Sequence, residues 1–202
     1  MGFPETIQIS ELVPESYIYG PGKRFVIWVQ GCSIHCTGCW NQDLWDFNGG
    51  NLHSINQIIE KIASISDLDG ITLLGGEPLD QAYSVLLLIT KVKQLNLSIF
   101  LYTGYEIVEI DSDAIKRKIF DLSDIIISGR YIQELRDLNL KWRGSSNQTV
   151  TVNQNHIDFI DERLNHVEIH YSDDGRIKII GYPDKKMINE LINHEFNIRE
   201  TV

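Results

Sequence analysis

Three cysteines stand close together in this sequence, and they are the residues best suited to metal or redox chemistry. Cys32, Cys36 and Cys39 follow a C-x3-C-x2-C spacing. Thiolate is a soft ligand that suits iron–sulfur clusters, and a cubane cluster needs four ligands, one for each iron. Because the chain has only 3 cysteines, a [4Fe–4S] cluster held here keeps one iron open for a substrate or cofactor. An odd, clustered set is also not a disulfide framework.

A zinc site and a chance spacing both stay open as interpretations of the three cysteines. A structural zinc ion wants four ligands, and His35 is the residue that would complete such a set. His35 is adjacent to Cys36, whereas zinc ligands are usually spaced farther apart, so we expect it to be an ordinary loop residue. Coincidence would leave the three thiols without a common ligand. We predict the cluster.

Length and composition indicate an ordinary globular protein. The chain has 202 residues, 43% of them hydrophobic, which fits one compact domain with a small appendage. A formal net charge of −10 makes nucleic acid a poor partner, because phosphate binding needs clustered Lys and Arg. No run approaches the roughly 20 apolar residues of a membrane helix, and the N-terminus lacks the layout of a secretion signal. We therefore expect a cytoplasmic protein without membrane contact.

The elements that must position the cysteines alternate between strands and helices. Apolar runs predict strands over 24–30, 71–74, 98–102 and 124–127. Helical periodicity predicts helices from Ser54, with a capping box to Gln57, and over 81–94 and 114–120. This alternation predicts an α/β fold of βαβ units, with a mainly parallel sheet covered by helices on both faces.

Four loops should meet at one edge of this sheet. The cysteine loop, 75–78, 103–105 and 128–130 each follow a predicted strand, and ligands of such folds sit at the carboxyl ends of the strands. After about Thr151 the pattern changes to a predicted β-hairpin over 167–180 and a closing helix over 184–194. We therefore predict a core domain over 1–154 and a C-terminal extension over 155–202 packed on it.

With these motifs the sequence resembles the radical S-adenosylmethionine superfamily, and within it the activating enzymes of anaerobic ribonucleotide reductase and other glycyl radical enzymes. The segments that carry the resemblance are Gly20-Pro21-Gly22-Lys23-Arg24, the cysteine loop through Asn41, Gly75-Gly76-Glu77-Pro78-Leu79, Tyr102-Thr103-Gly104-Tyr105 and Trp142-Arg143-Gly144-Ser145-Ser146-Asn147-Gln148. The last string is typical of the activase branch. Two features depart from the family pattern. The short reductase activases lack the C-terminal extension, and the family often has an acidic residue where this chain has Ser128.

The resemblance implies both a fold and a reaction. The fold is a partial (β/α) barrel with the cluster at its top. S-adenosylmethionine would chelate the open iron, and an electron from a flavodoxin-like or ferredoxin-like donor would cleave it to a 5′-deoxyadenosyl radical. In the activases that radical takes a hydrogen from a glycine of the partner enzyme. The cofactor carries this chemistry, while the protein supplies positioning and excludes water.

Family resemblance also suggests roles for single residues. Gly75 and Gly76 would let the backbone approach the methionine moiety, and Glu77 would pair with its ammonium group. Thr103 and Gly104 would contact the sulfonium or ribose.

The remaining candidates surround the same site. Arg130 would grip the cofactor carboxylate, and Trp40 and Asn41 would shape the cluster pocket. Two alternatives to the activase stay open: a radical enzyme that modifies a peptide or small molecule, and a non-catalytic iron–sulfur or zinc module. The Gly-Gly-Glu-Pro loop argues against the last, since an electron carrier needs no site for a cofactor amine.

Overall fold

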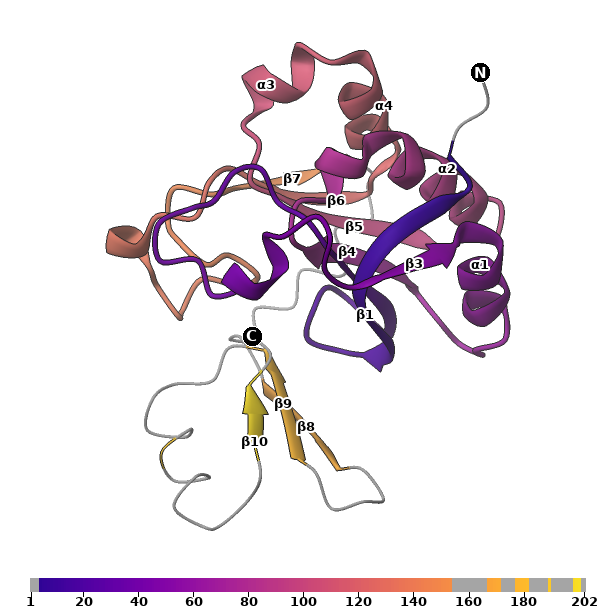
Figure 1. Ribbon diagram of the computed structural model, residues 1–202, viewed down its shortest axis with the longest axis horizontal. Coiled ribbons are helices and arrows are strands. Elements are labelled where there is room, and N and C mark those ends of the chain that lie inside the picture. Colours follow the sequence, from indigo (N-terminus) through magenta and orange to yellow (C-terminus); the bar gives the residue numbers. More distant parts are fainter. Residues whose placement is uncertain (1–3, 154–166, 172–176, 182–188, 190–197, 201–202) are drawn as a thin grey trace.

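The computed structural model describes residues 4–153, 167–171, 177–181, 189 and 198–200. A seven-stranded sheet in the order β3-β1-β2-β4-β5-β6-β7 forms the main body, and a smaller sheet has the order β10-β9-β8 (Figure 1). The main strands are β1 (Thr6–Ser16), β2 (Arg24–Val29), β3 (Asn51–Ser54), β4 (Gly70–Gly75), β5 (Ser98–Thr103), β6 (Ile125–Ser128) and β7 (Thr149–Val152). The helices are α1 (Ile55–Ala63), α2 (Ala82–Lys93), α3 (Ile107–Asp111) and α4 (Ala114–Leu122), with short 3-10 turns η1 (Gln42–Leu44), η2 (Pro78–Gln81) and η3 (Gln133–Leu135). The smaller sheet contains β8 (Val167–Tyr171), β9 (Ile177–Gly181) and β10 (Ile198–Glu200).

The centre of the main sheet is parallel, as the sequence predicts. Strands β2, β4, β5 and β6 run in one direction, with Val26 aligned to Thr72, Thr72 to Phe100 and Leu101 to Ile126. Every residue of β2 is buried, which accounts for its unbroken apolar run. Strands β1, β3 and β7 join at the edges in antiparallel pairs. The predicted α/β class with mainly parallel central strands is confirmed.

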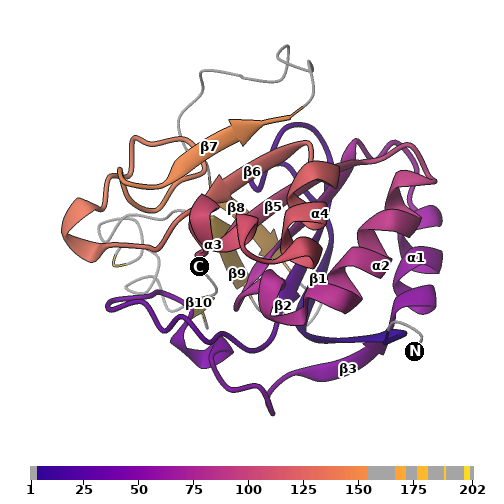
Figure 2. The same cartoon turned by 90° about the horizontal axis from the view of Figure 1, so that it is seen from above.

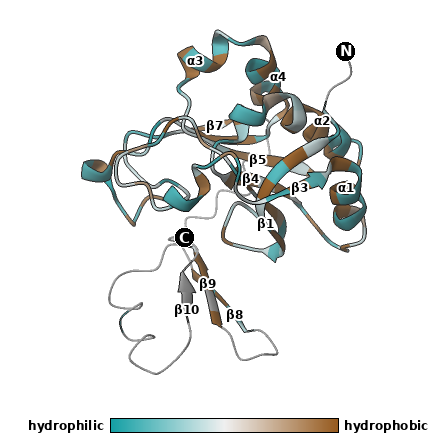
Figure 3. Ribbon diagram, viewed as in Figure 1, coloured by the Kyte–Doolittle hydropathy of each residue, from teal (hydrophilic) through white to brown (hydrophobic). Residues whose placement is uncertain are grey.

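The prediction that helices cover both faces of the sheet is wrong for the described residues. Helices α1, α2, α3 and α4 lie on one face of the main sheet (Figure 2). They bury their apolar side chains in one core cluster together with Ile27, Leu73 and Leu101 of the central strands. Successive side chains of a strand point to opposite faces. The helices therefore bury only every second side chain of each apolar run. The other face is covered by loops and by β9. In Figure 3 the central strands β4 and β5 carry hydrophobic colouring, while the helices show both hydrophobic and hydrophilic segments.

Several local features differ from the sequence prediction. Ser54 precedes α1 as its N-cap, but its side chain makes no capping hydrogen bond, so the predicted capping box is wrong. Strands β1, β3, β7 and β10 and helix α3 have no counterpart among the predicted elements. Helix α3 has its own capping box, between Glu106 and Glu109. None of the described helices is long and apolar enough to span a membrane.

Arg24 is buried at the start of β2, at the end of the strand opposite the cysteine loop. Its side chain is only 1% exposed, and burial lowers its pKa to about 10. The guanidinium donates to the hydroxyl groups of Thr72 and Ser98 at 2.8 and 3.0 Å, and to the carbonyl oxygens of Pro21, Ile71 and Ser98. A buried guanidinium is tolerated when its donors are satisfied in this way. Arg24 therefore ties together the starts of β2, β4 and β5.

The smaller sheet belongs to the predicted C-terminal extension. Strands β8 and β9 pair antiparallel, with Ile169 aligned to Ile179, and β10 adds to β9 in parallel. The residues that join β8 to β9 lie outside the described residues, as does the predicted helix over 184–194 apart from Asn189. Ile180 is 1% exposed, in a core cluster that includes Trp28 and Leu74. Strand β9 thus packs on the face of the main sheet that carries no helix.

Candidate cofactor site

A cavity of about 210 Å³ opens at the carboxyl ends of the parallel strands. Its lining includes the predicted site residues Cys32, Cys36, Cys39, Trp40, Asn41, Gly75, Gly76, Glu77, Thr103 and Gly104. The structure therefore brings together every predicted site residue except Arg130. Trp28, Leu74 and Tyr102 line it from the strands, and Gly181 lines it from the extension.

The cysteine loop leaves β2 and winds around one side of this cavity. Backbone hydrogen bonds from Gly31 to Leu44 and from Cys32 to Trp45, at 2.8 and 3.2 Å, hold it against the segment around η1. The backbone turns through left-handed conformations at His35 and at Gly38, with φ of 51° and 74°. The His35 ring stacks on Trp45 with ring centroids 4.5 Å apart. The structure thus gives His35 a packing contact within the loop.

The three thiols are a donor set that fits a [4Fe–4S] cluster with one open iron. All are free cysteines on one cavity, and the chain has no fourth. Burial raises the pKa of both Cys32 and Cys36, so cluster binding must displace thiol protons. Within the described residues, no three Cys, His, Asp or Glu side chains form a ready-made metal site. The thiolates of a cubane cluster bind separate irons, so they do not need to converge on one metal ion.

Two glycines bring the end of β4 against the end of β2. A Cβ at Gly76 would lie 2.2 Å from the carbonyl oxygen of Gly31, and one at Gly75 would lie 2.7 Å from backbone atoms of Val29. Gly75 also has a φ of 110°, which a side chain rarely permits. This close approach lets the amide of Glu77 donate to the Gly31 carbonyl at 2.8 Å. The glycines are thus required by the strand packing itself.

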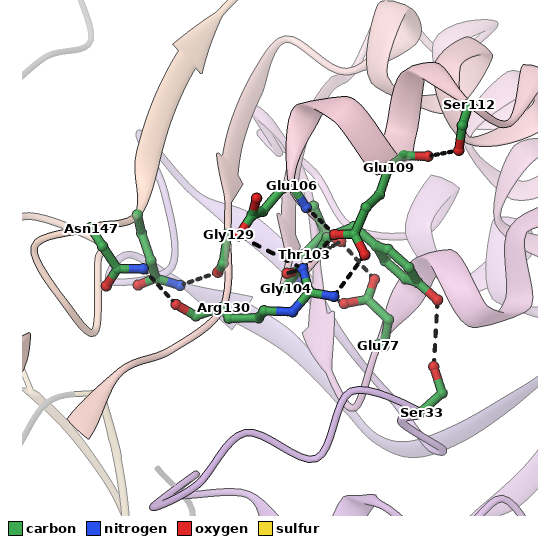
Figure 4. A network of polar contacts seen from close by, with 12 residues as sticks. Ser33, Glu77, Thr103, Gly104, Glu106, Glu109, Ser112, Gly129, Arg130 and Asn147 are labelled. Carbon is green, nitrogen blue, oxygen red and sulfur yellow. Dashed lines mark hydrogen bonds and ion pairs between the residues drawn. The ribbon is translucent and has the colours of Figure 1, made fainter.

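Glu77 is a buried carboxyl group held by three donors, of which Thr103 and Gly104 are seen in Figure 4. Its Oε1 accepts from the amide of Leu79 and from the hydroxyl of Thr103, and its Oε2 accepts from the amide of Gly104, each at 2.8 Å. It is 1% exposed, and burial raises its pKa to about 7. A cation entering the cavity would favour the ionised form, because opposite charges stabilise one another most where water is excluded. The Thr103 hydroxyl is already engaged in orienting this carboxylate.

Asp80 fixes the cysteine loop from the other side. Its carboxylate accepts from the backbone amide of Ser33 at 2.6 Å and from the Ser33 hydroxyl at 2.9 Å, and the Tyr105 hydroxyl donates to it at 2.7 Å. Asp80 links the loop after β2 to the loops after β4 and β5. It was missed from sequence, although it stands three residues after Glu77 in the same motif.

Arg130 lies beside the cavity and is engaged elsewhere. Its guanidinium forms a two-pronged ion pair with Glu109, with Nη2 2.7 Å from Oε1, and also donates to the carbonyl of Gly104 at 3.4 Å (Figure 4). This pair lowers the pKa of Glu109 to about 2. The expected contact of Arg130 with a cofactor carboxylate stays a prediction, and the structure instead places it under the loop after β5.

A different arginine lines the cavity. Arg143, in the loop before β7, is half-buried, and its Nε is buried without a hydrogen-bond partner among the described residues. Its Nη1 donates to the carbonyl of Gln148 at 3.3 Å. The string that contains Arg143 stands out in the sequence as a family motif, but nothing in its spacing marks this arginine as part of the site.

Comparison with known proteins assigns the family. A family model described as a 4Fe-4S single cluster domain matches residues 18–151. The anaerobic ribonucleoside-triphosphate reductase-activating protein of Vibrio cholerae is 34% identical over 145 residues, which cover 68% of this chain and 92% of that protein. Its counterpart in Escherichia coli K12 is 32% identical over 145 residues, covering 68% and 93%. The chain belongs to this family.

The activating-protein family confirms the resemblance to radical S-adenosylmethionine activases, and the chain is an enzyme of that type with a [4Fe–4S] domain. A member from Enterobacteria phage T4 is 33% identical over 148 residues, covering 70% of this chain and 92% of that protein. Among solved structures, QueE from Escherichia coli aligns with 49% of this chain and 53% of its own, at a TM-score of 0.40 and 18% identity. The family model ends at residue 151, so Gly181 is a cavity residue outside the matched segment.

Proposed function

We propose that this chain activates a glycyl radical enzyme of the anaerobic ribonucleoside-triphosphate reductase type. Cys32, Cys36 and Cys39 would hold a [4Fe–4S] cluster, with S-adenosylmethionine at the open iron. The observation that carries the proposal is one cavity that holds three thiols and a buried carboxyl group, Glu77, in a chain of the activating-protein family.

The residues of this chain would position the cofactor and exclude water. When bound, a cluster held by Cys32, Cys36 and Cys39 would supply the one-electron reductive cleavage of S-adenosylmethionine that the removal of hydrogen from a glycine of the partner requires. Glu77 would bind the cofactor ammonium, oriented by its hydrogen bonds from Thr103 and Gly104. Trp40 and Asn41 would shape the rim, since both line the cavity. Arg130, paired with Glu109, would support the Gly104 loop through its hydrogen bond to the Gly104 carbonyl.

The finer fold and the partners are part of the same proposal. Four parallel strands with all described helices on one face support a partial (β/α) barrel whose inner face carries the cavity. We propose a core over 1–154 and an extension over 155–202 that closes this inner face through β9, supported by the buried Ile180. The electron donor would be a flavodoxin-like or ferredoxin-like protein, and we propose no nucleic acid or membrane partner.

Anaerobic reconstitution tests the chemistry. Full-length protein loaded with iron and sulfide should release 5′-deoxyadenosine from S-adenosylmethionine when dithionite is added, whereas Cys36→Ala should bind less iron and release none. Added reductase partner should then gain a glycyl radical, seen by electron paramagnetic resonance. Stoichiometric zinc in anaerobically purified protein, without iron or sulfide, would refute the proposal and favour a zinc module.

One observation favours a second candidate, a radical enzyme that modifies a peptide or small molecule. Gly181 lines the cavity and lies beyond the matched segment, so the space around the cofactor differs from that built by the family segment alone. Release of 5′-deoxyadenosine without a glycyl radical on the reductase would support this candidate over activation.

A further inference from the structure

Arg143 stands out among the charged residues of the cavity. Those that line it are Glu77, Arg136, Asp137 and Arg143. The guanidinium of Arg136 lies over the Trp40 ring, 4.0 Å from its centroid. Within the described part of the chain, Arg143 has neither an ion pair nor a stacked ring, and its buried Nε has no partner. A buried donor without a partner costs free energy, which an anionic ligand would recover.

The loop that carries Arg143 is held rigidly against the end of β6. The Gln148 side chain accepts from the amides of Gly144 and Ser145 at 2.8 and 3.2 Å, and donates to the carbonyl of Gly129 at 3.0 Å. Asn147 donates to the carbonyl of Arg130 at 2.8 Å (Figure 4). Arg143 is therefore presented from a fixed backbone, as a binding residue should be.

We propose that Arg143 binds the carboxylate of the S-adenosylmethionine held in this cavity, an inference that rests on the proposed function. The amino-acid end of this ligand has one ammonium and one carboxylate group. The cavity offers the buried carboxyl group of Glu77 for the first and the guanidinium of Arg143 for the second. A guanidinium has five N–H donors and suits a carboxylate well. Arg130, the residue expected from sequence, already has the carboxylate of Glu109.

Equilibrium binding without reductant separates this contact from catalysis. Cluster-loaded full-length protein is titrated with S-adenosylmethionine and with its decarboxylated analogue, which keeps the sulfonium, the amine and the nucleoside. We expect Arg143→Gln to weaken binding of S-adenosylmethionine by about 10- to 100-fold, the usual range for a hydrogen bond to a charged group. The same variant should change binding of the decarboxylated analogue by less than about 3-fold, because no carboxylate is present to lose the contact.

Two variants act as comparisons. Arg117→Gln makes the same substitution on the surface of α4, where the arginine pairs with Asp111 and Asp121, and should leave both affinities unchanged. Arg143→Lys keeps the charge and should recover part of the preference for S-adenosylmethionine over the analogue. This variant also replaces Arg143→Gln in the test if the glutamine variant does not fold.

Each contrary result has a distinct meaning. If Arg143→Gln loses affinity equally for both ligands, or for neither, the proposed role of Arg143 is overturned. A loss specific to S-adenosylmethionine in Arg130→Gln, and not in the Arg143 variants, would overturn it in favour of Arg130. If wild-type protein releases 5′-deoxyadenosine but prefers S-adenosylmethionine over the decarboxylated analogue no more than the Arg143 variants do, this inference alone is overturned. Wild-type protein that binds neither ligand would overturn the proposed function as well.

Discussion

Replacing Glu77 by glutamine should change how the stability of the protein depends on pH. The pKa of this carboxyl group is raised from 4.5 to about 7, chiefly because burial disfavours the charged form. Below pH 4.5 both folded and unfolded chains are protonated at this group. Between pH 4.5 and 7 the unfolded chain loses the proton while the folded chain retains it, so folding stability falls as pH rises. A pKa difference of this size corresponds to about 3 kcal/mol.

Urea unfolding of the cluster-free, reduced protein, followed by tryptophan fluorescence, measures this effect. The free energy of unfolding of wild type, minus that of Glu77→Gln, should fall by about 2 to 3 kcal/mol between pH 5 and pH 7.5. Titration of histidines and other groups is common to both proteins and cancels in the difference. Glutamine also replaces one acceptor by a donor, which adds a constant cost of about 1 to 3 kcal/mol.

A control separates the site from the substitution. Glu60→Gln makes the same change at an exposed position of α1. Its free energy of unfolding, plotted against pH, should run parallel to that of wild type. If Glu77→Gln also runs parallel to wild type within about 1 kcal/mol, the reasoning from burial is refuted.

Three further changes test other parts of the structure. Arg24→Met should lower the free energy of unfolding by about 3 kcal/mol in urea, because it leaves the buried acceptors around Thr72 without their donor; a loss below about 1 kcal/mol would contradict this. Ile180→Ala should cost about 2 to 4 kcal/mol if the extension folds together with the core, and an unchanged urea midpoint would show that it does not. Asp80→Asn should weaken the hold on Ser33, so that a chelator removes iron faster than from wild type; equal rates would argue against anchoring by Asp80.

The central strands could be predicted because their local pattern and their environment agree. The apolar run of β2 becomes six buried residues, and each of the other parallel strands begins or ends within two residues of its predicted bounds. The placement of helices could not be derived in this way, since an apolar run says that both faces of a strand are buried but not by what. Here Tyr19, Trp142 and Ile180 occupy the second face. Tyr19 precedes β2 closely, but Trp142 and Ile180 come from segments distant along the chain.

The candidate site shows the same division between local and distant information. Cysteine spacing and the Gly75-Gly76-Glu77 motif are local, and the structure puts them on one cavity. The environment of Arg130 depends on Glu109, whose position is set by the capping box of a helix of five residues, and no spacing rule links the two. The sequence therefore indicates that Arg130 stands near the site, but it does not show that this arginine is already paired.

The absence of helices on the cavity face, among the residues that the structure describes, also gives the extension a physical reason to be there. Trp28 and Leu74 point away from the helices and line the cavity, and they are nonetheless 5% and 8% exposed. Ile180 packs in the same cluster, and the amide of Gly181 donates to the Tyr19 hydroxyl at 3.0 Å. A chain ending with the matched segment at residue 151 would leave this apolar surface against water or against a partner.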